Sequence, residues 1–511
     1  MVFSLVVLVF VFLLIWLRVT WCKMRDYWKV RGVPYSPPHP IMGSLTFLQK
    51  ENPATWLRKI YDSFKAPYVG VWLFRRPALV VNCPEIARRI LVTDNNIFRN
   101  RFASSGKSDP VGAHTLFLVK DPIWTSVRRR LTSVFTSAKL RSFQVITRKK
   151  AEDLVLRIKD EVKKDTPINL RMVCTDFSTD VIGESAFGVL CETTRTGDSF
   201  IRSVTRDFMH FGLYRGLCWS SIFFLPGIVD VFRFSLFPMD TIEHLRQILQ
   251  AIIKQRGGYG RDVKDTRDLL DALIKLKQEA EKHNEEMNED IILAQAAVLL
   301  LGGFDTSGVA ITWATYSLAW HPEYQEKLYS ELVAAKRKND NKEFDTNTLA
   351  QLTYLNCVIK ETLRKFPPMG WLDRQVSRDY QIDEKLTISA GTVVYVNAVG
   401  MQSDPEYFPE PMKFNPDRFL PENEKNIIPF TFMPFGEGPR GCIGKRFAYQ
   451  TVWFGLAAIF SNYEARPVPG SLPPDQCPVE KNGMFLMPVG KMSVQFVPRT
   501  FYNNKYTNIY Y

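Results

Sequence analysis

The sequence predicts a mainly α-helical fold with a small β region. Leucines at 269, 270, 273 and 276 share one helix face among Asp and Lys residues. Residues 387–399 are instead rich in β-branched side chains around Gly391, which favours strand. Long apolar runs at the N-terminus and near residue 300 complete the pattern. No internal repeat or low-complexity tract interrupts it.

Length and charge bound the class of protein. The chain has 511 residues, a net charge of +13, and 13% aromatic residues, including 36 Phe. Length alone suggests about three domains, and the aromatic content favours an extensive apolar interior. The positive charge suits nucleic acid, an anionic membrane or an acidic partner protein. Because no RNA- or DNA-binding module is visible, the membrane and the acidic partner are favoured.

The cysteines and histidines do not form a framework. There are 8 Cys and 6 His, all dispersed, without a Cys-x-x-Cys pair or the spacing of zinc ligands. This usage fits a reducing compartment rather than a disulfide-linked secreted protein.

The N-terminus predicts a membrane anchor over residues 1–22. Residues 1–17 carry no charge, and the 22-residue stretch spans roughly 33 Å as a helix. Trp16 and Trp21 suit the membrane interface. A cleaved signal peptide is the alternative, but the stretch lacks a basic start and a small-residue cleavage site. The following Lys23, Arg25, Lys29 and Arg31 predict that the rest of the chain lies in the cytosol.

Residues 23–44 are expected to link this anchor to the folded body. They are basic and then rich in proline, with four prolines between residues 34 and 40. Such prolines form a stiff, extended spacer. An ordinary surface loop is the alternative.

A second apolar stretch, residues 221–237, has two readings. It is too short and too interrupted to span a bilayer. A surface loop that dips into lipid and a helix buried in the core explain it about equally well.

A long buried helix is predicted from residue 288 to near Pro322. Residues 291–304 are almost wholly apolar, with Gln295 as the exception. Gly302, Gly303, Asp305 and Thr306 then place flexible and polar groups inside it. Such a local conflict marks either a structural kink or a functional site that handles protons. The segment alone does not separate these.

The loop at residues 435–444, Phe-Gly-Glu-Gly-Pro-Arg-Gly-Cys-Ile-Gly, is the most informative feature. A lone cysteine is usually a small buried hydrophobe. Here the neighbouring arginine suits a thiolate offered to a metal. Glycines at 436, 438, 441 and 444 permit positive φ and a close approach of the backbone to a flat cofactor.

This Phe-x-x-Gly-x-Arg-x-Cys-x-Gly pattern resembles the haem-binding loop of the cytochrome P-450 family. The resemblance implies that Cys442 is the metal ligand, the axial thiolate of haem b. It implies that Arg440 pairs with a haem propionate and that Phe435 shields the sulfur. Gly438 and Gly444 shape the same loop. Residues 131–137 and the loop itself look most like insect microsomal members.

Further elements of that family follow in the expected order. Glu361 and Arg364 match its Glu-x-x-Arg element, and residues 414–419, with Arg418, match a second. The resemblance implies that these three form a buried charge cluster serving folding and haem retention. Trp124, Arg128 and Arg374 match positions that hold a haem propionate. In the central helix, Asp305 and Thr306 match residues that organise water and deliver protons.

The resemblance implies one catalytic body over residues 45–511, with the cytochrome P-450 fold. The expected activity is insertion of one oxygen atom from O2 into an apolar xenobiotic or endogenous lipid- or hormone-like compound. The electrons would come from NADPH through NADPH-cytochrome P-450 reductase, with cytochrome b5 as an optional second donor. The expected location is the endoplasmic reticulum membrane, on the cytosolic face.

Three other functions compete with this one. A haem-thiolate isomerase or dehydratase would need no reductase, but the retained Asp305 and Thr306 disfavour it. A non-catalytic, haem-binding membrane protein that sequesters ligands is a rival of another class. Nucleic-acid binding rests on charge alone.

Overall fold

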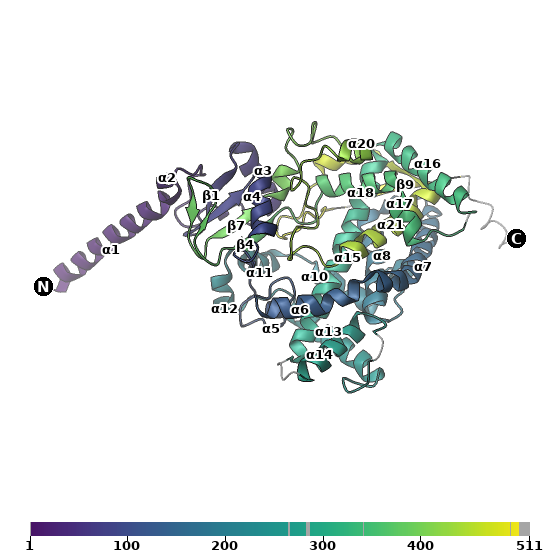
Figure 1. Cartoon of the computed structure of the whole chain (residues 1–511), viewed down its shortest axis with the longest axis horizontal. Helices are drawn as coiled ribbons and strands as arrows, with labels where there is room; N and C mark the ends of the chain where they lie inside the picture. Colours follow the sequence, from purple (N-terminus) through teal and green to yellow (C-terminus); the bar gives the residue numbers. More distant parts are fainter. Residues whose placement is uncertain (1, 264–265, 283–286, 341, 491, 500–511) are drawn as a thin grey trace.

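The computed structural model describes residues 2–263, 266–282, 287–340, 342–490 and 492–499. It shows a helical body with small sheets at its edges, from which one N-terminal helix extends (Figure 1). The predicted fold class is therefore confirmed.

The helices of the first half of the chain are α1 (Val2–Arg25), α2 (Tyr27–Val30), α3 (Pro53–Ser63), α4 (Pro84–Arg88), α5 (Pro110–His114), α6 (Ile123–Thr132), α7 (Ser137–Val162), α8 (Leu170–Phe187), α9 (Thr193–Thr196), α10 (Phe200–Phe208), α11 (Leu213–Phe224), α12 (Val229–Phe232) and α13 (Met239–Gln255). Those of the second half are α14 (Leu269–Lys282), α15 (Glu289–Ala319), α16 (Pro322–Lys338), α17 (Thr346–Gln351), α18 (Thr353–Lys365), α19 (Ala398–Met401), α20 (Pro421–Glu424) and α21 (Lys445–Asn462). The tighter or wider turns are η1 (Leu45–Phe47), η2 (Arg89–Thr93), η3 (Ser133–Phe135), η4 (Pro226–Ile228), η5 (Pro416–Phe419) and η6 (Pro474–Gln476). The strands are β1 (Tyr68–Leu73), β2 (Arg76–Val81), β3 (Ile168–Asn169), β4 (Leu372–Gln375), β5 (Tyr380–Gln381), β6 (Thr387–Ile388), β7 (Val393–Val396), β8 (Tyr463–Pro467) and β9 (Ser493–Pro498).

The main sheet has the strand order β1-β2-β7-β4. β1 pairs with β2 and β4 with β7 in antiparallel fashion, whereas β2 and β7 run parallel, with Ala78 opposite Val393. The predicted strand region at 387–399 contains β6 and β7. Gly391, at φ 82°, occupies the turn between them, where a side chain would strain the backbone.

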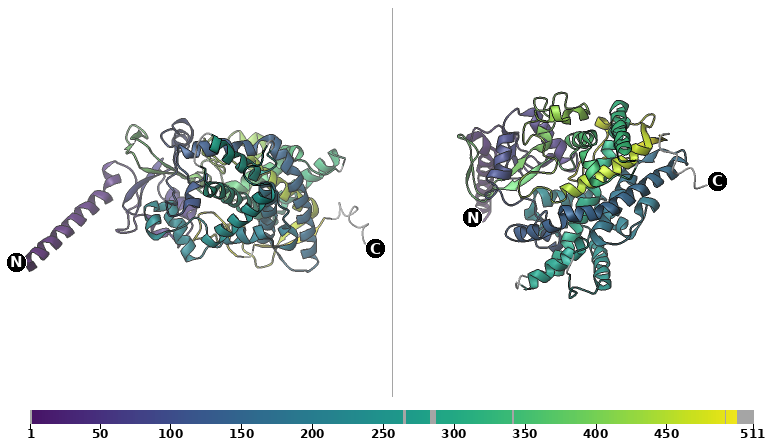
Figure 2. Two further views of the ribbon diagram at one scale, coloured as in Figure 1. Left: turned by 90° about the horizontal axis from the view of Figure 1, so that it is seen from below. Right: turned by 45° about the vertical axis from the view of Figure 1, so that its right-hand side comes forward.

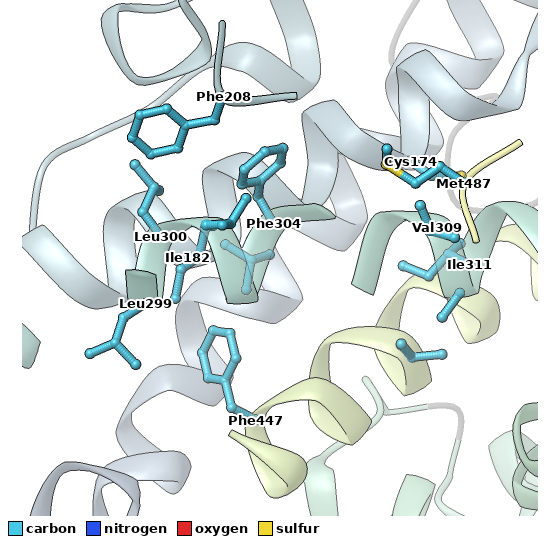
Figure 3. Close-up of a cluster of buried hydrophobic side chains, with 14 of the residues drawn as sticks. Cys174, Ile182, Phe208, Leu299, Leu300, Phe304, Val309, Ile311, Phe447 and Met487 are labelled. Carbon is cyan, nitrogen blue, oxygen red and sulfur yellow. The ribbon is translucent and has the colours of Figure 1, made fainter. Parts of the chain in front are cut away.

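Helix α15 runs through the centre of the body. Asn288 caps its start by accepting the Ile291 N–H, 3.0 Å away, and Pro322 begins the next helix directly after it. Helix α8 packs along α15, and α21 runs beside α7 (Figure 2). Figure 3 shows Ile182 of α8, Phe304 of α15 and Phe447 of α21 in one apolar cluster. The predicted buried helix is therefore confirmed.

Helix α1 extends away from the body and exposes its apolar side chains (Figure 1). Among the described residues, α1 and α15 are long and apolar enough to cross a membrane, and α15 is mostly covered by protein. Helix α1 therefore could act as a membrane anchor. It ends at Arg25, three residues beyond the predicted anchor.

The link after α1 packs against the main sheet. Trp28 is fully buried and donates its indole N–H to the Val71 carbonyl at 3.1 Å. Pro34 accepts the Gly70 N–H at 2.8 Å through its carbonyl. The proline-rich segment is thus held on β1 rather than free, because its backbone has found partners there.

The stretch 221–237 divides between the two readings of its sequence. Ser221 to Phe224 form the buried end of α11. By contrast, Val231 and Phe232 of α12 are 73% and 60% exposed. An apolar tip therefore protrudes beyond a segment that belongs to the core.

Candidate active site

A cavity of about 310 Å³ lies between α15, α11 and the Cys442 loop. Residues from distant parts of the chain line it. Helix α15 contributes Val298, Gly302 and Thr306 to the lining. The loop at residues 435–444 contributes Phe435, Cys442 and Gly444. The fold thus brings the predicted polar break of the central helix and the predicted cysteine loop to one space.

Backbone hydrogen bonds fix the shape of the cysteine loop. The Cys442 N–H donates to the Phe435 carbonyl at 2.8 Å, and the Gly441 N–H donates to the Gly438 carbonyl at 3.0 Å. The Phe435 ring packs on Tyr449, with ring centres 5.3 Å apart. These contacts hold the thiol at the wall of the cavity.

Two glycines of this loop serve different purposes. Gly438 has φ 72°, and a Cβ there would lie 1.9 Å from the Leu91 carbonyl oxygen, so neither the backbone nor the space admits a side chain. Gly444 has an ordinary φ of −89°. A Cβ on Gly444 would meet no described atom within 4 Å and would face open space. Positive φ was expected at four glycines of the loop, but it occurs at Gly436 and Gly438.

The Cys442 side chain is exposed because it borders the cavity, although protein encloses the loop on its other sides. Burial raises the pKa of its thiol. The Gly444 N–H and the positive charges of Arg128 and Lys445 oppose that rise by stabilising the thiolate. A bound metal ion would favour the thiolate further.

Buried cations gather at one edge of the cavity. Arg440 donates to the carbonyls of Arg99 at 3.0 Å and Val119 at 3.1 Å, and its guanidinium lies 4.0 Å from the centre of the Trp124 ring. Arg128, one turn after Trp124 on α6, lines the same cavity. Burial, together with the nearby charges of Arg101 and Arg374, lowers the pKa of Arg440 to about 8.

Arg374 lies slightly behind this edge, on β4. It is buried, and its guanidinium donates to the Asp373 carbonyl at 2.8 Å. Burial lowers its pKa to about 9, with Arg101 adding repulsion. Arg101, which the sequence analysis did not single out, lines the cavity and pairs with Asp373 at 2.9 Å. It lies in a loop without a recognisable motif, so only the fold reveals it.

The two predicted catalytic residues of α15 face different ways. Thr306 lines the cavity and donates its hydroxyl to the Gly302 carbonyl at 2.6 Å. Asp305 is buried against α8, where Arg171 pairs with it at 2.5 Å. Helical geometry requires this, because neighbouring residues point about 100° apart. A direct contact of Asp305 with the cavity would need a change of conformation or a chain of water molecules.

The three predicted cluster residues come together around the Glu361 carboxylate. Glu361 and Arg364 are fully buried and form two hydrogen bonds, of 2.7 and 2.8 Å. Arg418 approaches Glu361 at 3.5 Å. Arg364 also donates to the Gln402 carbonyl at 2.9 Å. Each charged group in this cluster thus has a partner from within the protein.

Comparison with known proteins agrees with this geometry. The cytochrome P-450 family model matches residues 33–496. The chain belongs to the cytochrome P-450 family. Cytochrome P-450 6j1 of Blattella germanica is 33% identical over 466 residues, which cover 90% of this chain and 92% of that protein. Probable cytochrome P-450 6g2 of Drosophila melanogaster is 32% identical over 461 residues, with coverages of 86% and 88%.

As a cytochrome P-450, the protein is an oxidoreductase of the monooxygenase type that binds haem b through a cysteine thiolate. The family also implies a redox partner and a small-molecule substrate. The predicted family and cofactor are therefore confirmed, and the exposed apolar helix α1 is compatible with a membrane-bound member.

The residues around the cavity suit haem b. Its two propionates are anions, and the cavity edge carries more buried cations than buried carboxylates, so anions are expected to bind there. Its flat ring needs backbone without side chains. Gly444 and Gly302 both line the cavity, and a Cβ on either would meet no described atom within 4 Å. One thiol, Cys442, lies between these features.

Proposed function

We propose that this cytochrome P-450 inserts one oxygen atom from O2 into an apolar organic substrate, with electrons from NADPH delivered by NADPH-cytochrome P-450 reductase. The observation that carries the proposal is that Cys442 and Thr306 line one cavity whose edge holds a surplus of buried cations. When bound, the haem supplies the oxygen activation, which a thiolate ligand favours.

Each lining residue has a distinct role in this proposal. Cys442 is the thiolate ligand, and Phe435 covers the sulfur. Trp124, Arg128 and Arg440 hold the propionates, with Arg374 acting from behind the edge. These charges also position the flat group, because buried charge-assisted hydrogen bonds are stronger and more directional than neutral ones.

The α15 residues hold and move protons. The Thr306 hydroxyl accepts a hydrogen bond from water on the cavity side while it donates to Gly302. Asp305, paired with Arg171 of α8, acts as a relay: its carboxylate takes up a proton from bulk water and passes it to a water molecule on the cavity side. Transfer from Asp305 to the cavity proceeds through water, because the carboxylate lies on another face of the helix.

The substrate is apolar, and it is a xenobiotic or an endogenous lipid- or hormone-like compound. Apart from the cations at its edge, the cavity is lined mainly by aromatic and aliphatic side chains, including Phe223, Val298 and Phe485. An ionised substrate would lose hydration there without gaining a counter-charge.

The reductase binds on the side of the cysteine loop. Arg129, Lys445 and Arg446 are exposed there. Such charges steer an acidic flavoprotein and speed its encounter at low salt. Cytochrome b5 would use the same surface.

Residues 1–22 anchor the protein in the endoplasmic reticulum membrane. Residues 23–44 link this anchor to the catalytic body, which residues 45–511 form on the cytosolic face. Lys23 and Arg25 at the end of α1 support this orientation. Val231 and Phe232 add a second contact with lipid, since apolar side chains this exposed favour an interface. In Figure 1, α12 lies toward the same end of the body as α1.

The decisive experiment measures product and peroxide together. Purified protein, reductase, NADPH and a neutral apolar compound such as 7-ethoxycoumarin should give oxidised product. Thr306→Ala should raise the hydrogen peroxide released per NADPH several-fold, because protons are delivered less well, and Thr306→Ser should restore coupling.

Thr312→Val is the matched control. Thr312 makes the same bond on the same helix, to the Gly308 carbonyl at 2.7 Å, but it is fully buried. Unchanged coupling in Thr306→Ala would refute the role of Thr306. A wild-type protein that binds the compound and haem yet consumes no NADPH would instead be a sequestering protein.

A further inference from the structure

The two ends of the loop formed by residues 101–120 meet at one ammonium group. Lys120 donates from Nζ to the carbonyl oxygens of Arg101, Phe102 and Ala103, the last two at 3.4 and 2.8 Å. An ammonium group has three N–H donors and no acceptor. These three bonds therefore use its full capacity.

A carboxylate holds the same three residues from the other side. Asp373 of β4 accepts the N–H groups of Phe102 at 2.8 Å and Ala103 at 3.2 Å. It also accepts Nη1 of Arg101 at 2.9 Å. The three carbonyls of residues 101–103 thus bond a cation, while an anion bonds the amides of Phe102 and Ala103 and the side chain of Arg101. This fixes the backbone from both sides.

The segment fixed in this way carries part of the cavity wall. The Arg101 guanidinium lies 4.1 Å from the centre of the Phe117 ring, and both residues line the cavity. Directly after residues 101–103, the Ser104 N–H donates to the Ile222 carbonyl at 3.0 Å. The base of the loop therefore determines where its cavity-lining residues lie.

The surroundings of Lys120 distinguish it from an ordinary surface lysine. Its side chain is partly buried, and burial lowers its pKa to about 8. Arg101 and Arg440 lie near enough to repel it. A cation in such a place is unfavourable unless its contacts offset the loss of water. The three carbonyls provide that offset.

We propose that Lys120 is a positioning residue that closes the base of the loop 101–120 and thereby sets the place of Arg101 and Phe117 in the wall of the substrate cavity. This inference rests on the proposed function, in which the cavity holds haem and an apolar substrate. Lys120 acts through its neighbours, since the part of the cavity lining that the structure describes does not include it.

The first test compares two ligands of haem iron in the full-length, haem-loaded protein. Imidazole and 1-phenylimidazole bind through the same kind of nitrogen, but only the second places an aryl group in the cavity. Lys120→Met should weaken 1-phenylimidazole about tenfold and imidazole less than about twofold, measured as dissociation constants from absorbance titrations. Lys120→Arg, which keeps the cation, should recover most of the affinity.

Lys139→Met is the matched control, because Lys139 also donates to a backbone carbonyl, that of Thr266, but does so at the start of α7. It should leave both dissociation constants unchanged. Equal weakening of both ligands by Lys120→Met, or no weakening of either, would overturn the proposal.

A second measurement does not depend on haem. In hydrogen–deuterium exchange, Lys120→Met should speed exchange of the amides of residues 102–104 about tenfold or more, while the amides of α15 keep their protection. Unchanged exchange at 102–104 would overturn the inference even in a protein that fails to load haem. If the wild-type protein gives no haem spectrum, but Lys120→Met still shows the faster exchange at residues 102–104, the proposed function is overturned and the inference about Lys120 is kept.

Discussion

Two groups of buried charges, one centred on Glu361 and the other at the edge of the cavity, differ in how their charges are balanced. Glu361, Arg364 and Arg418 form one, in which a fully buried carboxylate is bonded to one arginine and lies 3.5 Å from another. Arg101, Arg374 and Arg440 form the other, in which the Asp373 carboxylate pairs directly with Arg101.

The difference indicates different functions. In the first group, the backbone carbonyls of Gln402 and Pro411 accept further hydrogen bonds from Arg364, and the Glu410 carbonyl accepts one from Arg418. In the second, burial and mutual repulsion lower the pKa values of Arg374 and Arg440. One carboxylate serves two arginines in the first group, and one lies among three in the second. The first group therefore mainly stabilises the fold, whereas the larger excess of buried cations in the second favours an anionic ligand.

Glu361→Gln should have the largest effect, because it leaves the fully buried Arg364 and the half-buried Arg418 without their carboxylate. The expected loss is about 3–5 kcal/mol of the free energy of unfolding. It should appear as a lower midpoint in urea unfolding and as less haem per chain. Glu326→Gln is the control, since that carboxylate is 60% exposed beside Arg499 and should cost less than about 1 kcal/mol. Equal losses in the two variants would remove the first half of the comparison.

Arg440→Met tests the second group. It should speed haem loss about tenfold to a hundredfold, as expected for a lost charge-assisted bond of about 1.5–3 kcal/mol. The apoprotein should lose less stability than Glu361→Gln does, because a surplus charge leaves with the side chain. Transfer of haem to apomyoglobin measures the first quantity, and urea unfolding of the apoprotein the second. If Arg440→Met lowers the free energy of unfolding of the apoprotein but leaves the rate of haem release unchanged, Arg440 has a structural role instead.

Arg418→Met should have the smallest effect. It tests how the stability of the Glu361 group is divided between its two arginines. Arg418 lies farther from Glu361 than Arg364 does, and Arg364 bonds Glu361 twice. We expect a loss of about 1–2 kcal/mol, less than half that of Arg364→Met, in the same unfolding assay. A larger loss from Arg418→Met would mean that distance does not rank these partners.

The parts of the site that are predictable from sequence are those with local signatures. The cysteine loop, the Glu361–Arg364 pair and the apolar run of α15 each concentrate their information within a few residues. Residues 387–399 likewise show their strands through β-branched side chains and Gly391. In each case a local pattern has one strongly favoured structure.

The remainder depends on long-range packing. α15 is buried on most sides, so its sequence does not tell which face meets the cavity, and only the fold places Asp305 against Arg171. Arg101 and Lys120 are single cations in a loop, without a pattern around them. The link residue Trp28 finds its partner, Val71, 43 positions away. Such pairings are absent from any short window of sequence.

The central claim is that the Cys442 thiolate binds haem iron, and a carbon monoxide difference spectrum of the reduced protein tests it most directly. Under these conditions a thiolate ligand moves the main haem absorption band to a longer wavelength than a nitrogen ligand does, because the thiolate donates electron density to the iron. The wild-type protein and Cys477→Ala, a control on a half-buried cysteine outside the described cavity lining, should both show this shifted band, and Cys442→Ala should not. A Cys442→Ala protein that keeps the band, or a haem-loaded wild-type protein that lacks it, would contradict the account.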